Sequence, residues 1–375
     1  MNTIYSKVWN PALGAMVVAS ELARMEGKGR TRTSRRLAAV VALAVGSLMT
    51  GSAFAAVTPP TPTPVTGTTT VVVDPTGAVA ISGPAAGGTT NAAVKGSNDA
   101  AVGSGAVTDG SNGTALGAGA QEQGDNGTAV GASANAVGNA AVAVGQSATA
   151  TGADSTALGT GASAATDTSV AVGQGAQAAG AAAMAIGTAA NAAGTNSIAF
   201  GQGAKTTNNY SLAIGSPNAA GTVTTAGANN TIAIGAGTQA TGPNALAIGN
   251  PSNTFATGIL TTASGSNSVA LGAGAQATAG SSMALGNSTV ASGASSIALG
   301  SRATDTSVSS SVVVGPGASI TNLTLTGTTV SVLGGYSNDV AMGNGAAMYA
   351  ATSSIAIGAQ SFVGDATASP VAVRA

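Results

Sequence analysis

The sequence contains no cysteine and no histidine, and only 2% of its 375 residues are aromatic. These absences exclude thiolate and imidazole metal sites, cysteine nucleophiles and the Ser-His-Asp arrangement. The acidic residues of the chain fall in predicted turns, where a structural role is expected, as for Asp125, Asp154, Asp167 and Asp305. We therefore expect no enzyme activity, no cofactor and no bound metal.

Charge is also scarce, because Asp, Glu, Lys and Arg together make up 6% of the sequence. Seven of the eleven basic residues precede residue 37, whereas residues 56–375 carry four basic and ten acidic side chains, a net charge of −6. A sparse, mildly acidic surface argues against nucleic acid as a partner. The chain instead has 56 glycines and a hydrophobic content of 44%, mostly Ala and Val. Such a biased composition is typical of repeat proteins.

Residues 1–55 have the features of an export signal. The stretch "RTRTSRRLAAVVALAVGSLMTGSAFAA" begins with basic residues, continues with an apolar run over 37–48, and ends in small residues. The run is shorter than the roughly 20 residues that a membrane-spanning helix needs. Ala53-Phe54-Ala55 satisfies the A-x-A rule, so the sequence predicts cleavage after Ala55.

The first thirty residues carry a further resemblance. They contain M-N-x-I-Y at the start, V-W-N at 8–10, and the Ala-Leu-Gly and Ser-Glu-Leu-Ala stretches. This leader resembles the extended signal-peptide region of large Gram-negative autotransporters. The resemblance implies export across the inner membrane. The Pro/Thr/Gly-rich residues 56–97 that follow are predicted to be a linker and lead-in.

One glycine recurs every fourteen residues from 103 to 215, over eight consecutive steps. Longer steps follow, which indicates insertions. Because glycine adopts positive φ without strain, we interpret each one as a corner of the repeat. The predicted structural glycines are Gly103, Gly117, Gly131, Gly145, Gly159, Gly173, Gly187, Gly201, Gly215, Gly235, Gly249, Gly272, Gly286, Gly300, Gly315, Gly343 and Gly358.

An apolar–Ala–apolar triplet or a near variant precedes each glycine, and alternation puts its first and third residues on one face of a strand. The half-repeat after the glycine alternates small residues, and Asn or Asp marks a second corner. One repeat is thus two short strands and two turns, which predicts an all-β solenoid of 14-residue coils. We expect the larger triplet residues to face inward, namely Ile198, Phe200, Leu212, Ile214, Leu246, Ile248, Ile297 and Leu299.

A single coil of this kind buries too little apolar surface to offset the entropy of ordering fourteen residues. Stacking of coils is therefore required. The triplet alanines would then lie on the reverse face, where a row of small, uncharged residues suits close packing against another chain. From this we expect self-association.

The same residues carry a second resemblance. The pattern N-S-(V/I)-A-(I/L/F)-G-x-x-A, as in residues 196–204 and 267–275, is similar to the head repeat of trimeric autotransporter adhesins of the YadA type. The resemblance covers residues 98–363 and leaves 364–375 as a tail. It implies a left-handed parallel β-roll, association into a homotrimer, and a place on the bacterial outer membrane or cell surface.

Three insertions interrupt the repeats, at residues 216–230, 250–267 and 316–338. Insertions in solenoids form loops on one face, often the binding face. The second insertion would place Phe255, Ile259 and Leu260 in a partner-binding loop. The alternative is a loop that folds over neighbouring coils and caps them.

Taken together, the sequence predicts a non-enzymatic adhesin head that attaches to host cells or to extracellular matrix proteins; the resemblance implies collagen or fibronectin. Two alternatives stay open: a secreted structural or ice-binding solenoid, and a truncated remnant. No heptad repeat for a stalk and no aromatic-ended barrel strands are evident in the sequence. We therefore expect either a fragment or a protein secreted without its own anchor.

Overall fold

The computed structural model describes residues 5–10, 15–20, 70–73, 75–82, 92–251, 258–306, 309–321, 323–326, 329–332, 338–349, 353–364 and 371–373. The chain divides into two units, Met1–Pro64 and Val65–Ala375. In the first unit, β1 (Tyr5–Asn10) pairs antiparallel with β2 (Ala15–Ser20). The predicted cleavage site at Ala55 lies outside the described residues.

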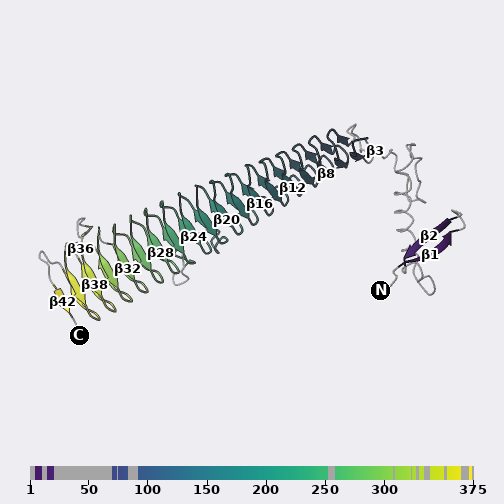
Figure 1. Cartoon of the computed structure of the whole chain (residues 1–375). Helices are drawn as coiled ribbons and strands as arrows, with labels where there is room; N and C mark the ends of the chain where they lie inside the picture. Colours follow the sequence, from purple (N-terminus) through teal and green to yellow (C-terminus); the bar gives the residue numbers. More distant parts are fainter. Residues whose placement is uncertain are drawn as a thin grey trace. The chain divides into compact units, whose positions relative to one another are not determined.

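The second unit is a parallel β-solenoid, as predicted, in which each coil contributes one strand to each of two sheets (Figure 1). The first sheet, here called the long-strand sheet, contains the triplets. Its strands are β4 (Val79–Ser82), β6 (Ala100–Val102), β8 (Thr114–Leu116), β10 (Thr128–Val130), β12 (Val142–Val144), β14 (Thr156–Leu158), β16 (Val170–Val172), β18 (Met184–Ile186), β20 (Ile198–Phe200), β22 (Leu212–Ile214), β24 (Ile232–Ile234), β26 (Leu246–Ile248), β28 (Val269–Leu271), β30 (Met283–Leu285), β32 (Ile297–Leu299), β34 (Val312–Val314), β38 (Val340–Met342), β40 (Ile355–Ile357) and β42 (Val371–Val373).

The second sheet, the short-strand sheet, follows the corner glycines. Its strands are β5 (Ala93–Val94), β7 (Val107–Thr108), β9 (Gln121–Glu122), β11 (Asn135–Ala136), β13 (Thr149–Ala150), β15 (Ser163–Ala164), β17 (Gln177–Ala178), β19 (Asn191–Ala192), β21 (Lys205–Thr206), β23 (Thr225–Ala226), β25 (Gln239–Ala240), β27 (Thr262–Ala263), β29 (Gln276–Ala277), β31 (Val290–Ala291), β33 (Thr304–Asp305), β35 (Ser319–Thr321), β39 (Ala347–Tyr349) and β41 (Phe362–Val363). In both sheets each strand pairs in parallel with the equivalent strand of the next coil.

Backbone hydrogen bonds join each coil to both of its neighbours. In one regular coil, the Val142 N–H donates to the Ser155 carbonyl at 2.8 Å, and the Gly145 N–H donates to the Val130 carbonyl at 2.7 Å. The Thr149 N–H likewise donates to the Ala162 carbonyl at 2.8 Å. Each such bond contributes about 1 kcal/mol net. Stacking therefore supplies the stability that an isolated coil lacks.

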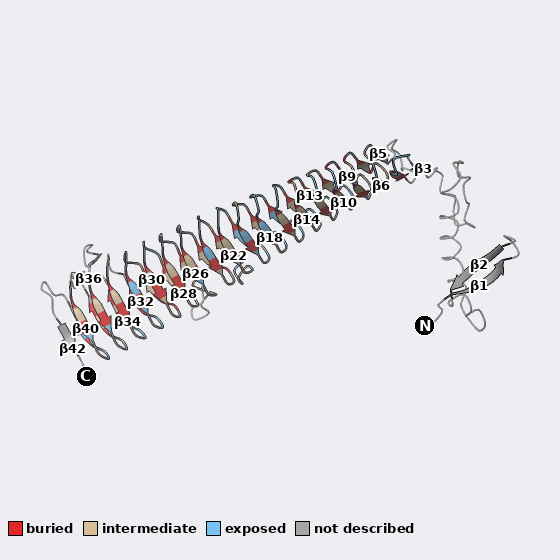
Figure 2. Ribbon diagram, in the orientation of Figure 1, coloured by how far each residue is buried: buried red, intermediate tan, exposed pale blue. Residues whose placement is uncertain are grey.

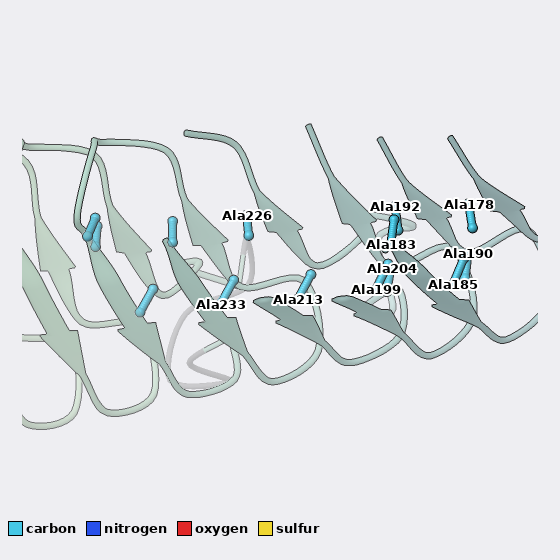
Figure 3. Close-up of a cluster of buried hydrophobic side chains, with 14 of the residues drawn as sticks. Ala178, Ala183, Ala185, Ala190, Ala192, Ala199, Ala204, Ala213, Ala226 and Ala233 are labelled. Carbon is cyan, nitrogen blue, oxygen red and sulfur yellow. The ribbon is translucent and has the colours of Figure 1, made fainter. Parts of the chain in front are cut away.

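The interior of the roll is filled mainly by alanine, with serine and threonine at some inward positions. Each regular coil points four side chains inward, two from each half; in one coil they are Ala141, Ala143, Ala148 and Ala150, all fully buried. Buried residues recur in the strands of successive coils (Figure 2), and the buried alanine side chains of the two sheets lie between the strands (Figure 3). Methyl-sized side chains on both sheets let the sheets approach closely, which makes a narrow core.

The prediction that the larger triplet residues face inward is wrong for the single chain. The middle residue of each triplet, alanine in all but β34, is buried, and its two neighbours lie on the outer surface. Ile198 is 39% exposed and Phe200 is 50% exposed, while Ala199 between them is fully buried. The predicted alternation is present, but the two faces are exchanged, because the narrow interior is filled mainly by small side chains and leaves little room for Ile, Leu or Phe from the triplets. The residues affected are Ile198, Phe200, Leu212, Ile214, Leu246, Ile248, Ile297 and Leu299.

The two predicted corners have the expected backbone. All seventeen repeat glycines have positive φ, for example +134° at Gly145. The second corner holds a left-handed residue, usually Asn, such as Asn112 with φ of 59°. Its side-chain amide donates to Asn126 Oδ1 at 3.3 Å and accepts from Asn98 Nδ2 at 3.2 Å. These amides form a short ladder along the corner that links successive coils.

The solenoid extends beyond its predicted limits of 98–363. At the N-terminal end, β3 (Thr70–Val73) pairs antiparallel with β4, and β4 pairs in parallel with β6, within the predicted linker. At the other end β42 pairs with β40, within the predicted tail. The third insertion is shorter than predicted, because β35 belongs to a regular coil. It contains an antiparallel hairpin of β36 (Leu323–Thr326) and β37 (Thr329–Val332).

The narrow core predicts a sharp difference between the two positions of one short strand, β13. Replacing the buried Ala150 by leucine should destabilise the fold by about 1–3 kcal/mol, because the added carbons have no space between the sheets. Replacing the neighbouring outward residue, Thr149→Leu, should change stability by less than about 0.5 kcal/mol. Thermal unfolding of both variants measures the difference; equal effects would contradict the interior assignment.

The corner glycines should also differ in their tolerance of substitution. A Cβ at Gly145 would lie 2.5 Å from the carbonyl oxygen of Gly159 in the next coil, so Gly145→Ala should cost more than about 3 kcal/mol. Gly161 also has positive φ, but a Cβ there meets nothing within 4 Å. Gly161→Asn should therefore cost less than about 1 kcal/mol, since Asn tolerates the left-handed region. Urea unfolding compares the two, and a silent Gly145→Ala would show that the coils can separate at this corner.

Candidate functional site

The outer surface of the long-strand sheet carries a continuous line of large apolar residues. The third position of every triplet is apolar and either half-buried or exposed, with Leu299 at 45% exposure. We call this line the apolar row; its members are Val102, Leu116, Val130, Val144, Leu158, Val172, Ile186, Phe200, Ile214, Ile234, Ile248, Leu271, Leu285, Leu299, Val314, Met342 and Ile357. Soluble monomers rarely expose a contiguous apolar surface of this length.

A second outward row belongs to the same sheet. From residue 170 onward the first position of each triplet is also apolar, as in Met184, Ile198 and Leu246. Nearer the N-terminus this position holds Thr114, Thr128 and Thr156, with Val142 between them. These threonines face outward but form no continuous array, so the surface lacks the regular threonine spacing that an ice-binding solenoid would show.

The short-strand sheet presents the opposite chemistry. The outward residue of each of its strands from β9 to β29 is polar, and Lys205 is the one charged side chain among them. We call this line the polar row: Gln121, Asn135, Thr149, Ser163, Gln177, Asn191, Lys205, Thr225, Gln239, Thr262 and Gln276. Some of its amides bond to one another, as where Asn191 Nδ2 donates to Gln177 Oε1 at 3.2 Å. The two faces of the roll therefore differ in the partners they suit.

The first insertion folds back onto the roll. The regular coil resumes at β23, so the loop is shorter than the predicted 216–230. The Asn218 side chain accepts hydrogen bonds from the N–H groups of Ala220 and Thr222, at 3.0 and 2.8 Å. The Gln239 amide donates to the Val223 carbonyl at 2.7 Å. This insertion therefore caps adjacent coils, which is the alternative that the sequence analysis gave to a partner-binding loop.

The predicted partner-binding loop is only partly described. Phe255 lies outside the described residues. Ile259 and Leu260 are half-buried, so they are less exposed than a binding loop was expected to make them. The next residue, Thr261, bonds through its hydroxyl to the carbonyls of Asn250 and Gly272, which ties the end of the insertion to two coils.

The sequence analysis missed the acidic residues inside the roll. Asp305 is not in a turn: it lies on β33 and is fully buried, near Asp339 of a later coil. Burial, and then the charge of Asp305, raise the pKa of Asp339, although a hydrogen bond from the Ser354 N–H opposes this. Asp99 and Glu122 are buried in the same way near the other end. The available signal was an acidic residue in an inward position that holds a small uncharged residue, mostly Ala or Ser, in the other coils.

The described residues contain no group of three or more His, Cys, Asp or Glu side chains that could hold a metal ion. Within the same ranges, no helix is both long and apolar enough to cross a bilayer.

Comparison with known proteins identifies both parts of the chain. Residues 1–50 match the extended signal peptide of the type V secretion system. The YadA head domain repeat matches residues 95–120, 123–148, 150–176, 178–204, 192–216, 226–250, 252–275 and 277–303. Both resemblances noted in the sequence are thereby confirmed.

Among solved structures, the chain is similar to the crystal structure of the collagen-binding domain of the Yersinia adhesin YadA. The two are 36% identical over 33% of this chain and 69% of that one, with a TM-score of 0.32. No curated protein matches the sequence. The head-repeat matches span more than half of the sequence and coincide with the coils of the solenoid. The chain therefore belongs to the family of adhesins built from YadA head domain repeats.

Proposed function

We propose that the solenoid is the head of a homotrimeric, non-enzymatic adhesin that attaches bacteria to host extracellular matrix or host cells. The observation that carries this proposal is the apolar row on the outside of a roll whose interior is already filled with alanine. A row of this length in water is unfavourable, since each buried Val, Leu or Ile side chain is worth about 1.5–3 kcal/mol. Association of identical chains along this row would remove it from water.

A threefold arrangement suits the shape of this surface. The apolar residues form a straight line parallel to the axis of the solenoid, with one contribution from each coil. Three such lines can meet along a common axis, and every coil then contributes to the contact. Packing would be continuous from the first coils to the last, in the way that stacked repeats stabilise one another.

Such a trimer would leave the polar row exposed on three outer faces. These faces carry amides and hydroxyls but almost no charge, so they suit hydrogen bonding to a large, extended partner and not ionic capture. Each contact would be weak, but identical contacts repeated along a rigid rod act together through avidity. Collagen and fibronectin are the first ligands to test, because the family resemblance implies them.

The leader supports a location outside the cytoplasm. A type V secretion signal peptide directs export, and display on the outer membrane or cell surface is the location in which an adhesin head can reach host ligands. We therefore place the mature head on the bacterial surface.

Charges introduced in the apolar row should prevent association without unfolding the single chain. Leu158 is 45% exposed, and Ile248 lies in the same row six coils later. The double variant Leu158→Glu/Ile248→Glu would bring like charges together at the trimer axis, so it should sediment as a monomer. The control Gln177→Glu/Gln276→Glu, in the polar row, should stay trimeric. Analytical ultracentrifugation distinguishes them; a monomeric unsubstituted head would rule out the trimer.

Matrix binding should depend on the trimer. The purified exported chain should bind immobilised collagen or fibronectin, but not albumin, and the monomeric Leu158→Glu/Ile248→Glu variant should bind at least tenfold more weakly because it has lost avidity. Surface plasmon resonance at equal protomer concentration provides the comparison. If a stable trimer binds neither matrix protein nor any host-cell surface, the adhesin proposal fails while the trimer proposal stands.

A further inference from the structure

Glu122 occupies an unusual place for a carboxylate. It is the inward residue of β9, it is fully buried, and neither carboxylate oxygen has a hydrogen-bond partner among the described residues. Thr108 of β7 pairs with it in register in the adjacent coil, and its hydroxyl is also buried without a partner. Isolated buried charges are strongly unfavourable, so this site favours a neutral carboxylic acid.

The surrounding coils are adapted to this side chain. A Cβ at Gly113 would lie 2.0 Å from Glu122 Oε2, and a Cβ at Gly127 would lie 2.5 Å from Oε1. Neither glycine has a positive φ, so the turn does not require them. The equivalent positions of the next two coils are Ala141 and Ser155. The two glycines thus provide the space that the Glu122 side chain fills, so the packing of the neighbouring coils accommodates a buried acid at this position.

Inside the roll, the charged group nearest to Glu122 is also acidic. Asp99 is also buried, and its two oxygens accept hydrogen bonds from the N–H groups of Gly113 at 2.9 Å and Gly96 at 2.8 Å. On the outer surface, Asp109 forms an ion pair with Lys95. Asp125 is also exposed at the adjacent corner, where it accepts a hydrogen bond from the Ser111 N–H at 2.9 Å. The described contacts give Glu122 no basic partner.

This environment changes the acidity of Glu122. Burial, and then the charge of Asp99, raise the pKa of Glu122 to about 7, with a smaller contribution from Asp109. The backbone N–H groups of Gly110 and Gly127 oppose this rise in part, although neither makes a hydrogen bond of normal geometry to the carboxylate.

We infer that Glu122 is a proton-dependent latch of the N-terminal coils: β7, β9 and the turns around them stay closed while its carboxyl group is protonated and open more readily once it ionises. The pKa of Glu122 is higher in the closed roll than in the open chain. The stability that the protonated carboxyl group of Glu122 contributes is therefore complete below the ordinary glutamate pKa of 4.5. This contribution is lost as the pH rises toward 7 and changes little above that. Mildly acidic surroundings would then tighten this end of the head, and neutral or alkaline surroundings would loosen it. This inference does not depend on the proposed ligand.

Amide hydrogen exchange of the full chain tests the latch. Protection factors, corrected for the intrinsic pH dependence of exchange, are compared at pH 5 and pH 8 for residues 106–127 and for residues 134–178. In the first segment protection should fall on the order of 70-fold at pH 8, the change that a pKa shift from 4.5 to about 7 produces through linkage. The second segment has only small neutral residues inside and should not change.

Two variants assign the effect to Glu122. Glu122→Gln should give protection that is the same at both pH values, whereas Gln121→Glu, which adds a carboxylate on the outward side of the same strand, should keep the unsubstituted pH dependence. If Glu122→Gln folds poorly, the triple variant Gly113→Ala/Glu122→Ala/Gly127→Ala rebuilds the alanine interior and should also be protected equally at both pH values.

Three results would overturn the inference. The first is equal protection of residues 106–127 in the unsubstituted chain at pH 5 and pH 8. The second is a full pH dependence that survives in Glu122→Gln. The third is recovery of protection at pH 8 when Ca²⁺ or Mg²⁺ is added to the unsubstituted chain but not when it is added to Glu122→Gln. The last would show that a cation, and not a proton, neutralises the site.

Discussion

The close approach of the two sheets determines the rest of this structure. Most strands are only two or three residues long, and the space between the sheets admits mainly the small side chains of Ala, Ser and Thr. The interior is therefore filled by Ala143, Ala150 and other small residues, and the larger apolar side chains of the long-strand sheet lie on the surface, except Val313. A roll of this cross-section cannot bury its own hydrophobic residues, so its architecture creates the surface that another chain would cover.

The same constraint explains why glycine recurs at fixed intervals for two different reasons. At the corner after each long strand, positive φ and the carbonyl of the next coil both exclude a side chain, as at Gly145. At the opposite corner Gly124 has no positive φ, yet a Cβ there would lie 2.4 Å from the carbonyl oxygen of Gly138. Adjacent coils pack so closely that backbone contacts backbone, which keeps the hydrogen-bond ladders short and regular.

The fourteen-residue period was sufficient to predict the solenoid, its parallel stacking and its corners, because these follow from local backbone preferences that repeat in every coil. The direction of the side chains was predicted wrongly, since alternation defines two faces without saying which one is inside. Hydrophobicity favoured Ile198 over Ala199 as the core residue, but the width of the roll, which is a tertiary property, decides this. The burial of Glu122 was missed for a related reason. It depends on the space beside Gly113 and Gly127, which become neighbours of Glu122 only when coils stack.

The acidic and the largest inward side chains occur near the two ends of the solenoid, whereas the central coils depart from alanine only to serine and threonine. Near the C-terminal end the inward positions of the short-strand sheet hold Ile320 and Met348, and there β35 and β39 are three residues long instead of two. Near the N-terminal end the extra volume of Glu122 is compensated by two glycines. At these places a larger inward side chain is accompanied either by a longer strand or by removal of the facing side chains. The central coils keep small, uncharged residues inside, so the end coils can carry ionisable or larger residues without disturbing the stack between them.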